Sequence, residues 1–371
     1  MNPSLQKDSN LVVTLVHLGK KPDAHYWLNL NKISNDFPSF QVMAVVSTGV
    51  VPDSKLSSAV SVYEYSAEPE VEKIFESHKY DHKFREGFWR FTLERLFALT
   101  QLHESIADKK ILHIESDVML LPNFPFRKVE NLSKTTWCRF NEFKDVSSIL
   151  FLPDLKSSRS LRENLFAELL ENNKHTDMTI LNSIARKNSD IQIFPSLSRQ
   201  LPKLQNPLNS ECDKNEFNIC SNEELNGIVD PAAIGMWLTG LDPRNFYGIT
   251  KIHDRGIIET GDSYVDPSTY TYKLDSDNQL AISSEDNSVQ IFCLHIHSKN
   301  PMLFKEGWQK ELRELVQLSE AKEPHNHFNP KLLCKLILVN LKQKTFLAFI
   351  IGIPVLHRFR QSIQRLRMAI Q

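Results

Sequence analysis

Two carboxylates separated by one residue interrupt an apolar stretch of the sequence. Glu115 and Asp117 follow the apolar run 111–114, and a second apolar run starts at Val118. The first run predicts a buried strand, and ligands of open α/β sheets collect at the carboxyl ends of strands. In extended backbone the two side chains point the same way, so both can bind one hard divalent cation that carries phosphate oxygens. The alternative is that Asp117 caps a turn and Glu115 is solvated.

A second group of chemically capable side chains lies in the segment 290–301, which alternates in character as a strand does. His295 and His297 would share one side of that strand, and Lys299 follows them. Imidazole completes an oxygen-rich site well for Mn²⁺, which accepts mixed nitrogen and oxygen ligands. We predict that His297 completes a metal site with the two carboxylates, with His295 as the second choice. A His-x-His pair in a strand, taken alone, is more often structural.

Four further polar residues stand at places where function and structure compete. Arg95 lies in the helix predicted over 84–103, where its guanidinium suits a phosphate or a sugar, or forms a salt bridge on the helix surface. Asp177 and Asp230 each precede or open a predicted helix, so a capping role explains both without any chemistry. Arg244 follows in a turn, where it could bind a phosphate or an acceptor carboxylate, or be structural.

The elements that must position these residues alternate along the chain. Helix-length segments separate most of the predicted strands, which favours βαβ units, a largely parallel sheet and an α/β fold. The predicted strands are 11–18, 41–47, 60–65, 111–114 and 147–153.

The segment 95–118, with its arginine, its buried strand and its Glu-Ser-Asp, resembles the acidic-motif region of GT-A type nucleotide-sugar glycosyltransferases. Their usual signature is Asp-x-Asp, so Glu115 departs from it and the main metal role would rest with Asp117. The resemblance covers residues 10–300 through several motifs in the family's order. It implies a Rossmann-related mixed sheet flanked by helices, and transfer of a sugar from a nucleotide diphosphate with Mn²⁺ or Mg²⁺ as cofactor.

The resemblance also implies roles for individual residues. Arg95 matches the donor-facing arginine of the family, and Lys299 would hold the donor diphosphate beside the two carboxylates. Asp177 belongs to a segment whose acidic end contacts the transferring sugar in the family. If the enzyme inverts, Asp230 and then Asp177 are the candidates for the catalytic base, and Arg244 is expected at the acceptor.

Composition narrows the class of protein. The 371 residues carry a net charge of −1, so no overall field favours nucleic acid, and hydrophobic and charged contents of 41% and 24% are ordinary for a globular protein. The five cysteines are scattered, which is typical of reduced thiols in the cytosol. No secretory signal is visible at the N-terminus.

The C-terminal part differs in kind from the rest. Residues 331–371 hold eight lysines and arginines and no acidic residue, and their apolar run 346–356 is too short to span a bilayer. We predict a GT-A-like catalytic domain at 1–325 and a basic helical tail at 326–371, which binds the anionic cytoplasmic membrane surface. The alternative is a helix docked on a domain or a partner.

The sequence therefore favours a metal-dependent glycosyltransferase that is cytoplasmic and peripheral to the membrane. Its acceptor would be a glycan or a lipid-linked saccharide, as in polysaccharide biosynthesis. Two alternatives remain: a sugar-nucleotide nucleotidyltransferase, and a non-catalytic interaction protein on a degenerate transferase fold.

Overall fold

The computed structural model describes residues 9–19, 21–79, 84–196, 225–240, 263, 265, 267, 270–284 and 287–320. The chain divides into two compact units, Met1–Lys251 with Ile258–Lys322 and Ile252–Ile257 with Glu323–Gln371, and every described residue belongs to the first. Arg244 and the predicted tail at 326–371 lie outside the described residues. Among the helices that are described, none combines the length and the apolar character needed to cross a membrane.

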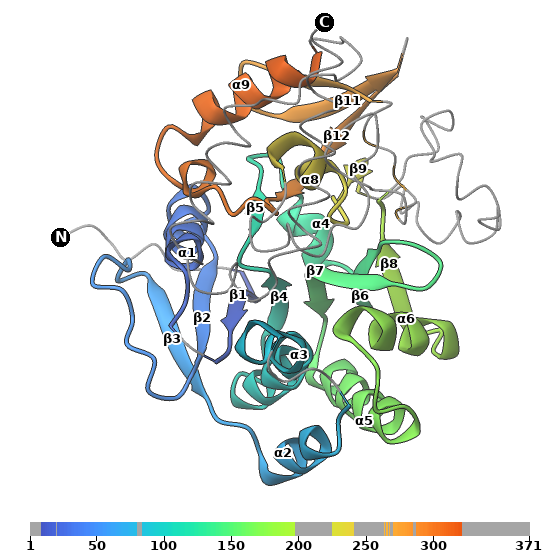
Figure 1. Cartoon of the computed structure of the whole chain (residues 1–371). Helices are drawn as coiled ribbons and strands as arrows, with labels where there is room; N and C mark the ends of the chain where they lie inside the picture. Colours follow the sequence, from blue (N-terminus) through green and yellow to red (C-terminus); the bar gives the residue numbers. More distant parts are fainter. Residues whose placement is uncertain are drawn as a thin grey trace, which may run out of the picture. The chain divides into compact units, whose positions relative to one another are not determined.

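A mixed seven-stranded sheet forms the centre of this unit, in the order β3-β2-β1-β4-β7-β6-β8 (Figure 1). β1 pairs in parallel with β2 and β4, whereas β7 runs antiparallel to both β4 and β6. The predicted strands and the mixed α/β class are confirmed. The strands are β1 Leu11–His17, β2 Gln41–Ser47, β3 Val60–Tyr65, β4 Lys110–Ile114, β6 Thr135–Arg139, β7 Asp145–Leu152 and β8 Ile191–Phe194.

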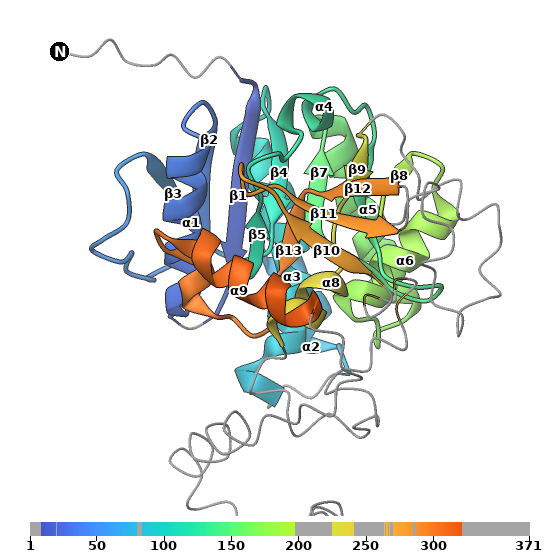
Figure 2. The ribbon, with the colours of Figure 1, turned by 90° about the horizontal axis from the view of Figure 1, so that it is seen from above.

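Both faces of this sheet are buried, because apolar residues occupy successive positions of its strands. In β1, Val13 and Leu15 belong to a core that includes residues of α1 and α4. Val12 and Val16 belong to a second core, which includes residues of α2, α3, α5 and α6 (Figures 1 and 2). The helices are α1 Ala24–Asp36, α2 Pro69–Glu76, α3 Phe88–Ser105, α4 Phe126–Glu130, α5 Leu155–Glu171 and α6 Asp177–Lys187.

Helix α3 begins at Phe88 and not at Phe84, where the aromatic spacing predicts it. Residues Phe84–Glu86 form a separate 3-10 turn, and Gly87 has a φ of 99°, a left-handed conformation that glycine adopts easily. The buried face of α3 is mainly aliphatic, with Phe97 as its one fully buried phenylalanine, whereas Phe84 is 38% exposed. The core face of this helix therefore lies further along the chain than the aromatic residues Phe84, Phe88, Trp89 and Phe91.

A second group of strands holds the C-terminal part of the described chain. β5 (Val118–Leu120) pairs antiparallel with β13 (Cys293–His295), and a separate four-stranded sheet has the order β10-β11-β12-β9. The single strand predicted from residue 290 is thus two strands. The other elements here are β9 Gly227–Ile228, α8 Ile234–Thr239, β10 Thr271–Leu274, β11 Leu280–Ser284, β12 Asn287–Ile291, the 3-10 helix η6 Pro301–Phe304 and α9 Trp308–Glu320.

The buried histidine at the end of α3 makes stability depend on pH. His103 is fully buried, with Nε2 2.8 Å from the carbonyl oxygen of Lys109, and burial lowers the pKa of His103. The unfolded chain takes up a proton below about pH 6.5 while the folded chain does not, so the free energy of unfolding falls as the pH drops below that value. We expect His103→Gln, which keeps an N–H donor, to lessen this fall by up to about 1.4 kcal/mol per pH unit. Urea titrations at about pH 7 and about pH 5.5 measure the difference, and parallel falls in both proteins contradict it.

Candidate metal and diphosphate site

A tight turn joins β4 to β5 and displays the two carboxylates. The N–H of Val118 donates to the carbonyl of Glu115 at 3.0 Å, which closes a β-turn with Asp117 at its third position. The N–H of Glu115 in turn donates to the carbonyl of Ser148 on β7, also at 3.0 Å. The sequence predicts that the acidic pair continues the extended strand. The pair lies in this turn instead, yet both side chains reach the same place.

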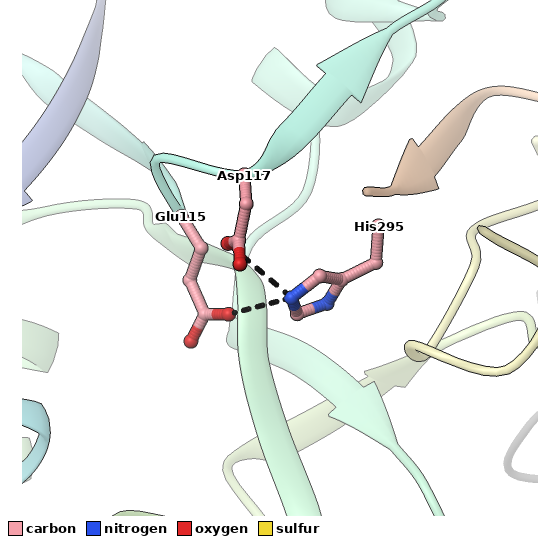
Figure 3. Close-up of side chains that lie close together, drawn as sticks. All are labelled: Glu115, Asp117 and His295. Atoms are coloured by element: carbon pink, nitrogen blue, oxygen red, sulfur yellow. Dashed lines mark ion pairs between the residues drawn. The ribbon is translucent and has the colours of Figure 1, made fainter. Parts of the chain in front are cut away.

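The carboxylates of Glu115 and Asp117 meet the imidazole of His295 (Figure 3). The Nε2 atom of His295 lies 3.4 Å from Oε2 of Glu115 and 3.3 Å from Oδ1 of Asp117. Neighbouring ligand atoms around an octahedral Mg²⁺ or Mn²⁺ are about 3 Å apart, and Mn²⁺ accepts imidazole beside oxygen ligands. One atom from each residue lies within 4.8 Å of the others, so the three residues fit a divalent cation.

The sequence favours His297 as the histidine of the metal site, but the histidine in this triad is His295. The ring of His297 instead stacks on that of His295, with centroids 4.5 Å apart and planes inclined by 27°. The antiparallel pairing of β13 with β5 explains the difference, because it sets His295 opposite Val118, next to the acidic turn. The sequence does not reveal this pairing, which only the folded chain creates.

Two cations accompany the carboxylates. Arg95 of α3 forms ion pairs with Glu115 and, at 2.9 Å, with Asp177 at the start of α6. Lys299 has its Nζ atom 3.2 Å from Oδ2 of Asp117. Arg95 therefore does not form the salt bridge on the helix surface that was the alternative prediction. Four of the predicted site residues gather with it in one largely buried cluster.

The charges in the cluster shift the pKa values of its members. Burial raises the pKa of Asp117, but Lys299 and His295 outweigh it and hold that pKa well below its usual range. Burial lowers the pKa of His295, but Asp117 and Glu115 together raise it to about 8. Burial also raises the pKa of Asp177, against the opposing effect of Arg95. Asp117 is therefore ionised at neutral pH and ready to bind a cation.

Asp230 sits behind the triad and binds backbone. It is fully buried; Oδ1 accepts from the N–H of Ile234 at 2.9 Å, and Oδ2 accepts from those of Gly235 at 2.6 Å and His295 at 2.9 Å. A Cβ on Gly235 would lie 2.3 Å from the carbonyl oxygen of His295, so only glycine lets α8 come this close to β13. Asp230 thus caps α8 and ties it to the strand that carries His295. A catalytic role for Asp230 stays a prediction.

One contributor to the site is absent from the sequence prediction. The hydroxyl of Ser147 on β7 donates to Oε1 of Glu115 at 3.2 Å. The antiparallel register of β4 with β7 brings it there, pairing Ile114 with Ile149. A serine in a predicted strand carries no signal of such a contact.

No family model matches the sequence, and no curated protein matches it significantly. Two of the similar solved structures are an active-site mutant of LgtC and the galactosyltransferase LgtC in complex with donor and acceptor sugar analogs. Each shows 12% identity and a TM-score of 0.38, and the match covers 57% of this chain and 83% of LgtC. A glycosyltransferase involved in glycosylation of the major capsid of PBCV-1 shows 12% identity and a TM-score of 0.30, with coverages of 49% and 80%. These neighbours are glycosyltransferases; at such low scores we draw no functional conclusion from the likeness.

The contacts of Asp230 predict that its substitution damages the fold. Asp230→Asn replaces one acceptor oxygen with an N–H₂ group that faces buried backbone donors, so we expect the free energy of unfolding to fall by about 2–4 kcal/mol. Asp154, an exposed residue that caps α5 through Ser157 N at 2.7 Å, provides the matched control. Asp154→Asn should leave stability unchanged, because Asn caps about as well as Asp. Normal stability of Asp230→Asn in urea unfolding would contradict the capping role and favour the catalytic one.

Proposed function

We propose that the chain is a metal-dependent glycosyltransferase, which moves a sugar from a nucleotide-diphosphate donor to a saccharide acceptor. The observation that supports this most is the convergence of Glu115, Asp117 and His295 beside the cation of Lys299. Two carboxylates and an imidazole suit Mn²⁺ or Mg²⁺, and a neighbouring ammonium suits the phosphate oxygens that such a cation binds. The cluster also follows the carboxyl end of β4, where ligands of α/β sheets bind.

Each residue of the cluster has a distinct part in this proposal. Asp117, Glu115 and His295 hold the cation, which when bound offsets the charge that builds up on the leaving diphosphate. Lys299 leaves Asp117 and binds the diphosphate oxygens. Arg95 holds Glu115 in place and opposes the rise in the pKa of Asp177 that burial causes.

Between the two predicted catalytic carboxylates, the contacts favour Asp177 for a place near the transferring sugar. Both oxygens of Asp230 accept backbone N–H groups, whereas Asp177 is held by a side chain, Arg95, that also contacts Glu115. Asp177 therefore belongs to the same cluster as the cation ligands. The acceptor, a glycan or lipid-linked saccharide, and attachment to the cytoplasmic membrane face through 326–371 rest on the sequence alone.

Asp117→Asn tests the metal proposal directly. The change keeps the size of the side chain but removes the negative charge that a hard dication needs. We expect stability without ligand to change by about 1 kcal/mol or less, since the partly exposed Lys299 can turn to solvent. A panel of nucleotide sugars at about 100 times Kd should stabilise the native protein by about 2.7 kcal/mol with Mn²⁺ present. The variant should lose this stabilisation, and its transfer rate should fall at least about a hundredfold.

The matched control is Asp154→Asn, which makes the same chemical change on an exposed helix start. It should retain Mn²⁺-dependent binding of the nucleotide sugar. Full transfer by Asp117→Asn would end the metal-dependent form of the proposal. Binding without transfer by the native protein, in every acceptor tested, would favour the non-catalytic alternative.

Lys299→Met separates the two parts proposed for that lysine. In the structure its ammonium contacts the carboxylate that should bind the cation. Loss of the ammonium should therefore tighten binding of Mn²⁺ alone by about tenfold. This factor corresponds to the repulsion in water between a single and a double positive charge about 5 Å apart. Binding of a nucleoside diphosphate in the presence of Mn²⁺ should weaken. Calorimetric titrations measure both, with Lys305→Met as an exposed control that removes the same charge. Weaker binding of Mn²⁺ alone by Lys299→Met would contradict the idea that Lys299 and the cation compete for Asp117.

A further inference from the structure

The backbone carbonyls of the acidic turn all have partners, and two of the four share one partner. The carbonyl of Glu115 accepts from Val118 N within the turn, and that of Asp117 accepts from Ile296 N at 2.6 Å. The carbonyls of Ser116 and Val118, which flank Asp117, depend on a side chain from elsewhere in the chain. Buried carbonyls without a donor are costly, so this side chain matters to the shape of the turn.

That side chain is Asn29, on α1. It is fully buried, and its Nδ2 group donates to the carbonyl of Ser116 at 3.1 Å and to that of Val118 at 2.8 Å. A primary amide has two N–H donors, and here both are used on the residues before and after Asp117. One turn earlier on the same helix, Nε2 of His25 lies 3.3 Å from the hydroxyl oxygen of Ser116. Helix α1 thus contacts the turn through two of its side chains.

We infer that Asn29 is a positioning residue for the cation site, which sets the affinity of the site without contacting the cation. The inference rests on the metal site proposed above and adds a residue that neither the acidic motif nor the resemblance points to. One bond of Asn29 fixes the peptide group between Ser116 and Asp117, and the other fixes the peptide group that follows Val118. Together they hold the stretch of backbone from which the carboxylate of Asp117 projects. Ligand carboxylates depend on such supporting contacts for their orientation, and losing one typically lowers metal affinity by about 10–100-fold.

Helix α1 also supplies a matched control for a purely structural effect. Asn31 lies two residues further on and likewise bonds backbone: its Nδ2 donates to the carbonyl of Lys55 at 3.0 Å, and its Oδ1 accepts from Ser57 N at 2.8 Å. These contacts hold the loop before β3 and touch no residue of the cluster. Loss of Asn31 should therefore lower stability and leave the cation site as it is.

The experiment titrates the full chain with Mn²⁺ alone and follows binding by calorimetry and by the rise in Tm. We expect Asn29→Leu, which is similar in size and has no donor, to bind Mn²⁺ about 10–100-fold more weakly than the native protein. Asn31→Leu should bind it with native affinity. If Asn29→Leu does not fold, Asn29→Ser replaces it in the experiment. The shorter serine side chain cannot reach both carbonyls, so this variant should also bind Mn²⁺ more weakly.

The outcomes separate the inference from the proposal beneath it. If the native protein and Asn31→Leu bind Mn²⁺ and the Asn29 variants bind it equally well, Asn29 is only structural and the inference is wrong. If Asn29→Leu and Asn31→Leu both lose affinity for Mn²⁺ in proportion to their loss of stability, the effect is likewise structural and the inference is wrong. If the native protein binds no Mn²⁺ at all, the metal site itself is wrong.

Discussion

Burial of three carboxylates in one place is the constraint on which the rest of this structure depends. Glu115, Asp117 and Asp177 are largely removed from water, and burying a charged group costs free energy unless an opposite charge is paired with it. Arg95 and Lys299 compensate that charge through three ion pairs, and the imidazole from β13 lies against two of the carboxylates. Removing Arg95, whose two carboxylate partners are largely buried, would leave uncompensated buried charge, which typically costs about 3–5 kcal/mol. The helices and strands around the cluster must therefore hold anions and cations in register with each other.

The mixed sheet meets this requirement because its neighbouring strands come from different parts of the chain. β4 delivers the acidic turn, and its antiparallel neighbour β7 supports that turn through Ser147 and Ser148. α3 places Arg95 over one face of the sheet, while α1 supports the turn from the other core. β13 closes the cluster by pairing with β5. Each of these elements touches the turn, so a shift in any one of them moves the carboxylates.

Sequence patterns predict the parts of this site that are local and miss the parts that pairing creates. The strand before Glu115 and the helix that opens at Asp177 follow from a few neighbouring residues, and the structure agrees with both, although Thr176 and not Asp177 caps the helix. The choice between His295 and His297 depends on the register of β13 against β5, which alternation within one strand cannot reveal. Asn29 carries no signal at all, because its carbonyl partners lie in a turn almost 90 residues away along the chain.

The distance along the chain between the two halves of the triad has a consequence for synthesis. Glu115 and Asp117 precede His295 by 180 and 178 residues, and the strand that carries the histidine pairs with β5 only by a long-range contact. A ribosome that has made only the large sheet has made the carboxylates but not the imidazole. Domains fold as their residues emerge, at about 5–20 residues per second. The growing chain therefore carries an incomplete set of ligands for seconds, and the complete set arises only when its C-terminal strands dock.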